Sequence, residues 1–150
     1  MDRQGEIRTG TGGWQENAAA GYKHFIGGFP ALYTRSQHDA LEADITSGAF
    51  ARRSQYSGSH ADENLGRSFF GLDDKGRALL VAVGQGSIYD RGLSLVAGAR
   101  LLRELGAREA YVLDGGFSTT LYVRGVEHAR TDGRQVWSYL GVRAKQGEKR

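Results

Sequence analysis

The pattern of apolar and polar positions predicts a chain built mainly from short β-strands. The clearest strands are expected at residues 68–72 and 78–83, joined by a polar Asp-Asp-Lys-Gly loop at 73–76. The glycine of this loop can adopt the positive φ that a tight connection needs. Because residues 78–83 are a nearly continuous aliphatic run, we expect this strand to be central in its sheet. A further β-prone run covers residues 109–113.

One segment, residues 95–105, has the period of an amphipathic helix. The apolar positions that share one face are Leu95, Ala99, Leu102 and Leu105. Ser94 is suited to be the N-cap, because its hydroxyl can accept a hydrogen bond from a free backbone N–H, and Gly106 is suited to end the helix. A second, shorter helix is expected at residues 38–47, ended by Gly48.

The rest of the chain reads as shorter strands and loops. Further strands are expected at 22–26, 31–34, 122–126 and 135–142, turns at 27–30 and 131–134, and a surface loop at 51–59. The prediction is therefore an α+β fold, a mainly antiparallel sheet with one long helix packed on it. We expect a flexible N-terminal segment at 1–20, a single domain at 21–143 and a charged tail at 144–150.

Composition excludes several classes of function. The 150 residues include 23 glycines, one proline and no cysteine, so disulfides, thiolate metal sites and a cysteine nucleophile are excluded. Sixteen of the 20 basic residues are arginine, but 17 acidic residues are interspersed and the net charge is only +3, so nucleic-acid binding is not expected. No apolar run reaches the length of a membrane span, and the N-terminus lacks the apolar core of a signal peptide. We therefore expect a cytoplasmic protein that does not contact membranes; its oligomeric state is open.

The most informative stretch is residues 110–121, which reads as strand, tight turn and strand. A carboxylate, two adjacent glycines and three hydroxyl residues lie between the β-prone flanks. Glycine lets a ligand approach the backbone closely, and backbone N–H groups freed in such a turn can bind an anion. The alternative is an ordinary hairpin with Asp-Gly at its turn, and these residues alone do not decide between the two.

Motifs in a fixed order extend this stretch into a resemblance. They are Gly66-Arg67 before a strand, Gly92-Leu-Ser-Leu, a helix ending Leu-Gly-Ala at 105–107, and Leu-Asp-Gly-Gly at 113–116. In this order and spacing, residues 64–125 resemble the phosphodiester glycosidase family. The resemblance implies cleavage of a sugar-1-phosphodiester, which needs a carboxylate near the anomeric carbon and donors that clamp the phosphate.

By motif position, the resemblance implies catalytic roles for Asp114 as the carboxylate and Arg67 as the phosphate clamp. It also implies a ligand-binding lining made by Gly115, Gly116, Ser118, Thr119, Gly92, Ser94 and Gly28. The expected ligand is a small sugar phosphodiester or a nucleotide-like molecule. No cofactor is expected, and the four histidines have no ligand-type spacing. A divalent cation held by Asp114 together with the substrate phosphate is left open.

Two departures from the family pattern bear on catalysis. Relatives carry a glutamate early in the helix, where this chain has Val-Ala-Gly at 96–98, and a glycine where this chain has Phe117. A second carboxylate would have to come from Asp62, Glu63, Asp90 or Glu109. The alternative hypothesis is therefore a catalytically inactive module that sequesters a phosphorylated sugar or nucleotide ligand at the same site.

Overall fold

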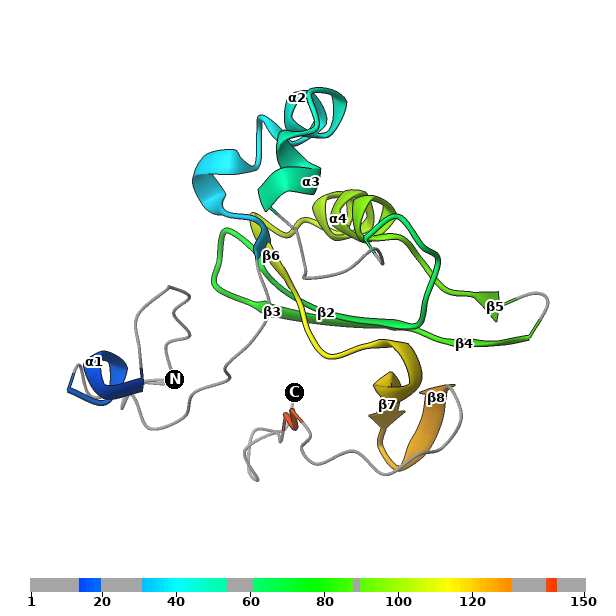
Figure 1. Ribbon diagram of the computed structural model, residues 1–150. Helices are drawn as coiled ribbons and strands as arrows, with labels where there is room; N and C mark the ends of the chain where they lie inside the picture. The colour runs from blue at the N-terminus through cyan, green and yellow to red at the C-terminus, as the bar shows by residue number, and fades with distance from the viewer. Residues whose placement is uncertain (1–13, 20–30, 54–60, 88–89, 131–139, 143–150) are drawn as a thin grey trace.

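The computed structural model describes residues 14–19, 31–53, 61–87, 90–130 and 140–142 (Figure 1). The strands are β1 (Ala31–Tyr33), β2 (Arg67–Leu72), β3 (Ala78–Val83), β4 (Gln85–Ser87), β5 (Asp90–Arg91), β6 (Glu109–Val112), β7 (Thr120–Val123) and β8 (Val126–Arg130). The helices are α1 (Trp14–Ala19), η1 (Arg35–Gln37), α2 (Leu41–Thr46), α3 (Ala49–Arg53), α4 (Leu95–Glu104) and η2 (Gly116–Ser118). The strand expected at 22–26 and the turns expected at 27–30 and 131–134 lie outside the described residues, as does most of the strand expected at 135–142.

The main sheet has four strands in the order β1-β6-β2-β3, and every neighbouring pair is antiparallel. Two further two-stranded sheets are β4–β5 and β7–β8. In Figure 1, α4 lies over the main sheet, and α2 and α3 lie beyond it on the same side. The mixed fold with antiparallel sheets is confirmed. The expectation of one long helix is met only in part, because α4 has ten residues and is accompanied by shorter helices.

Helix α4 begins where the sequence predicts and ends one residue earlier, at Glu104. The Ser94 hydroxyl accepts a hydrogen bond from the Ala97 N–H at 3.2 Å, and Gly106 follows the helix with a φ of +91°. The buried positions facing the sheet include Leu95, Ala99 and Leu102. Leu105, expected on the same face, is half exposed because it is already the C-cap residue.

The segment after β1 follows the prediction in part. The helix expected at 38–47 is present as α2, which begins three residues later at Leu41, and Gly48 follows its end with a φ of +73°. The short helix η1, before this range, was not expected. The expected surface loop at 51–59 begins inside α3. Phe50 explains this, because it is 1% exposed and its burial in the core holds α3 against the domain.

Strand β3 is at the edge of the main sheet, not at its centre. It pairs with β2 over its whole length, from Arg67 opposite Val83 to Leu72 opposite Ala78. No other strand of the described residues pairs with its outer side. The aliphatic run that predicted a central strand therefore occupies an edge in this chain.

The chain also turns earlier than predicted after β7. The strand expected at 122–126 is interrupted by Arg124 and Gly125, which have φ values of +53° and +81° and join β7 to β8. Two consecutive residues with positive φ make the primed turn that suits the twist of a hairpin. Arg-Gly is a weak signal for this turn, since asparagine or aspartate commonly occupies its first position.

No helix in the described part of the chain is long and apolar enough to cross a membrane. The domain boundaries proposed above remain predictions.

A buried tyrosine makes the stability of the fold depend on pH in the alkaline range. Tyr33 on β1 is fully buried, and its hydroxyl donates to the carbonyl oxygen of Ala107 at 3.1 Å. Burial raises the pKa of Tyr33 to about 12, and the positive charge of Arg103 opposes this rise. Because the folded-state pKa exceeds the unfolded value, the fold disfavours the phenolate. This contribution to stability is complete below about pH 10 and is lost as the pH rises towards 12.

The Tyr33→Phe variant is expected to be less stable than the wild type by about 1 kcal/mol at pH 7, because it loses this hydrogen bond. The difference should narrow above pH 10, since phenylalanine has no proton to lose. Urea unfolding of both proteins between pH 7 and pH 11.5 measures it. A difference that stayed constant over this range would contradict the raised pKa.

Candidate functional site

The 114–119 turn follows β6 and leads into β7. It is not the turn of a hairpin, because β6 pairs with β1 and β2 whereas β7 pairs with β8. The short helix η2 (Gly116–Ser118) redirects the chain between the two sheets, and Gly116 has a φ of +59°. A Cβ added to Gly116 would meet no atom within 4 Å. The hairpin interpretation of this stretch is therefore wrong, and the turn has another structural role.

That role is contact with the start of β2. Because β2 and β6 are antiparallel neighbours, the start of β2 and the end of β6 lie at the same end of the sheet. The Gly116 N–H donates to the carbonyl oxygen of Gly66 at 2.6 Å. A Cβ added to Gly115 would lie 2.9 Å from that oxygen and 3.4 Å from the Cα of Arg67. Glycine at position 115 thus permits the turn to lie directly on the Gly66–Arg67 backbone.

Arg67 is held in place by backbone carbonyl groups. Its side chain is largely buried, with a residue exposure of 9%. Nε donates to the carbonyl oxygen of Leu93 at 3.1 Å, and Nη2 donates to that of Glu63 at 3.2 Å. Burial lowers the pKa of Arg67, and the negative charge of Glu63 opposes this change. Arg67 is therefore a largely buried cation close to the negative charge of Glu63.

The motif at 92–94 reaches the same place from a third part of the chain. Leu65 and Leu93 exchange two backbone hydrogen bonds, with N···O distances of 3.3 and 2.9 Å. Gly92 has a φ of +73°, and a Cβ added there would lie 2.1 Å from the carbonyl oxygen of Leu65. Ser94 uses its hydroxyl to cap α4. The structure thus brings together the segments around Arg67, Gly92 and the 114–119 turn.

The backbone N–H groups of Gly115, Gly116, Ser118 and Thr119 already have partners inside the protein. Asp114 is exposed, and its Oδ1 accepts the N–H of Gly115 at 2.9 Å. The N–H of Ser118 donates to the Gly115 carbonyl, and that of Thr119 donates to the Gly116 carbonyl. An anion bound by these backbone groups would therefore have to replace internal acceptors. The exposed carboxylate of Asp114 is the accessible reactive group of the turn.

Thr119 lies beneath the turn and not on its surface. It is fully buried, and its Oγ1 has no hydrogen-bond partner among the described residues. A buried hydroxyl without a partner costs about 1–3 kcal/mol in lost hydration.

The Thr119→Val variant, which keeps the side-chain shape, is expected to be at least as stable as the wild type because it removes this unpaired hydroxyl. Thermal unfolding of both proteins measures it. A melting temperature lowered by more than a few degrees would show that the hydroxyl has a partner in solution.

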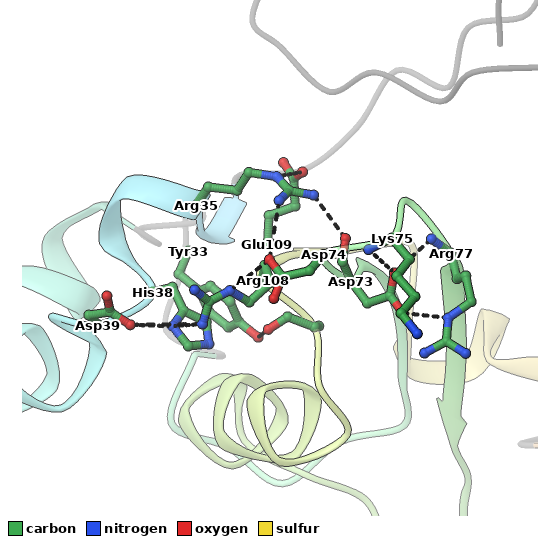
Figure 2. A network of polar contacts seen from close by, with 11 residues as sticks. Tyr33, Arg35, His38, Asp39, Asp73, Asp74, Lys75, Arg77, Arg108 and Glu109 are labelled. Carbon is green, nitrogen blue, oxygen red and sulfur yellow. Dashed lines mark hydrogen bonds and ion pairs between the residues drawn. The ribbon is translucent and has the colours of Figure 1, made fainter.

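One of the candidate second carboxylates is far from this site. Glu109 is at the start of β6, whereas Asp114 follows its end, and five residues of extended chain span about 16 Å. Figure 2 shows Glu109 in a polar network with Arg35, whose Nε lies 3.0 Å from its Oε1. Tyr111 donates to its other oxygen at 2.9 Å. Glu109 is therefore a structural carboxylate.

The network of Figure 2 joins η1, the 73–77 loop and the start of β6 at the end of the sheet opposite the candidate site. Arg35 Nη2 donates to the Asp73 carbonyl oxygen at 2.9 Å, and Arg108 Nε donates to Asp74 Oδ1 at 3.1 Å. Three hydrogen bonds from Arg77 and Lys75 hold the pKa of Asp73 below its usual value, the backbone N–H of Arg77 contributing most. These charged residues stabilise the loop and the strand ends. They lie at the end of the sheet away from Asp114 and take no part in the candidate site.

The other candidate carboxylates lie closer in the chain to the site. Asp62 and Glu63 are exposed and lie five and four residues before the first residue of β2, and the carbonyl oxygen of Glu63 accepts a hydrogen bond from Arg67. Asp90 lies on β5, paired with Ser87. Gly28 lies outside the described residues.

The departures at 96–98 and 117 also have structural counterparts. A Cβ added to Gly98 would lie 2.2 Å from the ring of Phe69, so the aromatic ring occupies the space of a side chain at this position. Val96 packs against the core. Phe117 is 54% exposed beside Gly116 and Ser118. The first turns of α4 therefore pack against the core through Val96 and Gly98, and they carry no acidic side chain at 96–98.

Gln85 was not identified from the sequence as part of this region. Its Oε1 accepts the N–H of Gly66 at 2.9 Å and so holds the segment on which the 114–119 turn lies. In the sequence, Gln85 only separates two glycines after an aliphatic strand. Its role depends on the fold, which brings β4 next to the start of β2.

No group of three or more histidine and acidic side chains that could hold a metal ion occurs within the described ranges. Asp114 alone could contribute a carboxylate ligand to a cation that a substrate phosphate also binds.

A family model described as phosphodiester glycosidase matches residues 2–143. No curated protein matches the chain. The crystal structure of a hypothetical protein from Synechocystis is 34% identical with a TM-score of 0.45, and the match covers 53% of this chain and 15% of that chain.

The catalytic domain of zebrafish N-acetylglucosamine-1-phosphodiester alpha-N-acetylglucosaminidase, auto-inhibited by its pro-peptide, is 24% identical with a TM-score of 0.49. This match covers 69% of the present chain and 34% of the zebrafish chain. The present chain therefore spans about a third or less of the length of these two structures.

Proposed function

The chain belongs to the phosphodiester glycosidase family, and from this premise we propose that it hydrolyses a sugar-1-phosphodiester at the 114–119 turn. The observation that carries the proposal is the contact between this turn and Gly66–Arg67. The hydrogen bond from Gly116 to Gly66 joins the segment with the exposed carboxylate to the segment with the buried guanidinium. The substrate would be a small molecule with a sugar and a second substituent on one phosphate.

Asp114 is proposed as the carboxylate that acts at the anomeric carbon. Its exposure leaves room for a sugar, and Gly115 and Gly116 add no side chain beside it. A carboxylate there can act as nucleophile or base, or it can stabilise the positive charge of an oxocarbenium-like transition state. Because a phosphate is a good leaving group, cleavage can proceed with little help from a general acid.

Arg67 is proposed as the phosphate clamp. A guanidinium presents five N–H donors in a planar fork that matches phosphate oxygens. The carbonyl groups of Leu93 and Glu63 fix its orientation before substrate binds. Its burial strengthens its attraction for the single negative charge of a phosphodiester, since the local dielectric is lower than that of water.

The remaining ligand-binding residues complete the proposal. Gly115, Gly116 and Ser118 would line the ligand from the turn, and Gly92 and Ser94 from the start of α4. Thr119 would support the turn from below. Gly28 is proposed on its motif position alone.

A binding module that does not cleave its ligand is the second candidate function. The observation that favours it is the start of α4, where Gly98 packs against Phe69 and no acid is present. Under this alternative, the same turn and Arg67 would retain a phosphorylated sugar or nucleotide unchanged.

One experiment separates the two functions. Purified protein is incubated with a panel of sugar-1-phosphodiesters, sugar nucleotides and cyclic nucleotides, and the products are identified by mass spectrometry. Release of free sugar supports the hydrolase. Recovery of an intact compound that stays with the protein through a desalting column supports the binding module, and neither cleavage nor retention of any compound would overturn both.

A further inference from the structure

Hydrogen bonds along β2 show which of its backbone groups face each neighbour. On the β6 side, the carbonyl oxygen of Ser68 accepts the N–H of Leu113 at 2.8 Å, and that of Leu72 accepts the N–H of Arg108 at 2.7 Å. Successive residues of a strand direct their backbone groups to opposite sides. The even-numbered residues of β2 therefore face β6, and the odd-numbered residues face β3.

The same alternation fixes the outer side of β3. Asp73 donates to the carbonyl oxygen of Arg77 at 3.1 Å, in register with the pairing of Gly71 with Leu79. Odd-numbered residues of β3 therefore direct their N–H and C=O groups into the sheet. The residues that direct these groups outward are Ala78, Leu80 and Ala82.

Among the described residues, this edge lacks the features that normally prevent pairing with another chain. Within β3 there is no charge, no proline and no irregularity of register over six residues. The opposite edge of the sheet differs, because β1 has only three residues and its register shifts between Ala31 and Tyr33. The nearest charge, on Arg77, is already paired with Asp73.

We propose that two copies of the chain pair β3 with β3, antiparallel about a two-fold axis at Leu80, to form one continuous sheet. In this register Leu80 faces Leu80 of the second copy, and Ala78 faces Ala82 of the second copy. The outward residues then form three facing pairs, each of which exchanges two hydrogen bonds. A shift by one residue would place inward-facing backbone groups opposite outward-facing ones, and a shift by two would leave outward groups unpaired.

The side chains of β3 suit a second copy of the same strand. On the face of the sheet that carries α4, Leu79 faces Val81 of the second copy. On the opposite face, Leu80 of each copy meets Leu80 of the other at the two-fold axis. Five of the six side chains are only half-buried in one copy, so the pairing covers further aliphatic surface. In the dimer β3 becomes an interior strand, which is the position that its aliphatic sequence predicts.

Sedimentation equilibrium over a range of protein concentrations tests the proposal. The wild type is expected to be a dimer that dissociates on dilution. The Leu80→Lys chain should be a monomer, because two lysines would meet at the axis, and so should the Leu80→Glu chain. A mixture of these two chains should form a heterodimer. Val123→Lys, on the exposed β7–β8 hairpin, is the matched control and should stay dimeric.

A wild type that is monomeric at all concentrations would overturn the proposal, and so would a Leu80→Lys chain that remains dimeric. Since the chain has no cysteine, Leu80→Cys gives an independent readout that keeps a small apolar side chain. Facing residues of a hydrogen-bonded antiparallel pair have Cα atoms about 5.5 Å apart, a distance that a disulfide spans. Oxidation should crosslink Leu80→Cys rapidly but not Val123→Cys, and equal rates would overturn the Leu80 register.

Discussion

Replacing Gly92 by alanine is expected to destabilise the fold by about 2–5 kcal/mol. Two costs add. A residue with a Cβ loses about 1–2 kcal/mol in the left-handed conformation that Gly92 adopts at a φ of +73°. The Cβ would also lie 2.1 Å from the carbonyl oxygen of Leu65 and 2.8 Å from the N of Gly66, and overpacking costs about 1–3 kcal/mol more. Since domains are stable by only about 5–15 kcal/mol, much of the population would unfold on mild heating.

Gly76→Ala is the matched control for this variant. Gly76 has almost the same φ, +72°, but a Cβ added there meets no atom within 4 Å. It should therefore lose only the conformational cost of about 1–2 kcal/mol. Urea unfolding of the three proteins measures both effects. Equal destabilisation of the two variants would show that the close approach of Gly92 to Leu65 does not exist in solution.

Asp114→Asn should lower kcat/KM for any sugar phosphodiester that the protein cleaves by at least about 100-fold. Removal of a single preorganised group at a reacting centre typically costs about 10²–10³. Asparagine has nearly the same shape but no negative charge, and its Oδ1 can still accept the N–H of Gly115. Because the side chain is exposed, stability should change little. The rate is measured as sugar released, with thermal unfolding as the check of folding.

The control for Asp114→Asn is Asp74→Asn, which changes an exposed carboxylate at the opposite end of the sheet. The side chain of Asp74 is 68% exposed and pairs with Arg108. Its replacement should leave turnover within about twofold. Asp74 is far from the 114–119 turn, and its surface ion pair contributes little to the stability of the fold. Full activity in Asp114→Asn would show that another carboxylate acts at the anomeric carbon. Asp62 and Glu63, which precede Arg67 in the chain, would be the next residues to replace.

Local features of the sequence predicted local features of the structure. Ser94 caps α4, Gly106 follows its end and Gly76 supplies the positive φ of the 73–76 loop. Each depends on residues close together in the chain, where propensity and capping decide the conformation. The strands at 68–72, 78–83 and 109–113 were also predictable, because their β-prone runs are bounded by turn residues.

Features that depend on distant residues were not predictable in the same way. The aliphatic pattern of β3 predicted a central strand, but the structure places β3 at the edge of the main sheet with none of its residues fully buried. Phe50 was missed because a single aromatic residue in a polar segment has no periodicity. The contact of the 114–119 turn with Gly66 was reached through family motifs, since no local rule brings residues 50 positions apart together.

The assembly of the site from three separate parts of the chain has a thermodynamic consequence. The segments around Arg67, Gly92 and Asp114 are neighbours only when β2, α4 and β6 are in place, so the unfolded chain has no site. A compound that binds there must therefore raise the free energy of unfolding by RT ln(1 + [L]/Kd), about 2.7 kcal/mol at a concentration 100 times Kd. Thermal shift is thus a way to identify the ligand that does not depend on whether the ligand is cleaved.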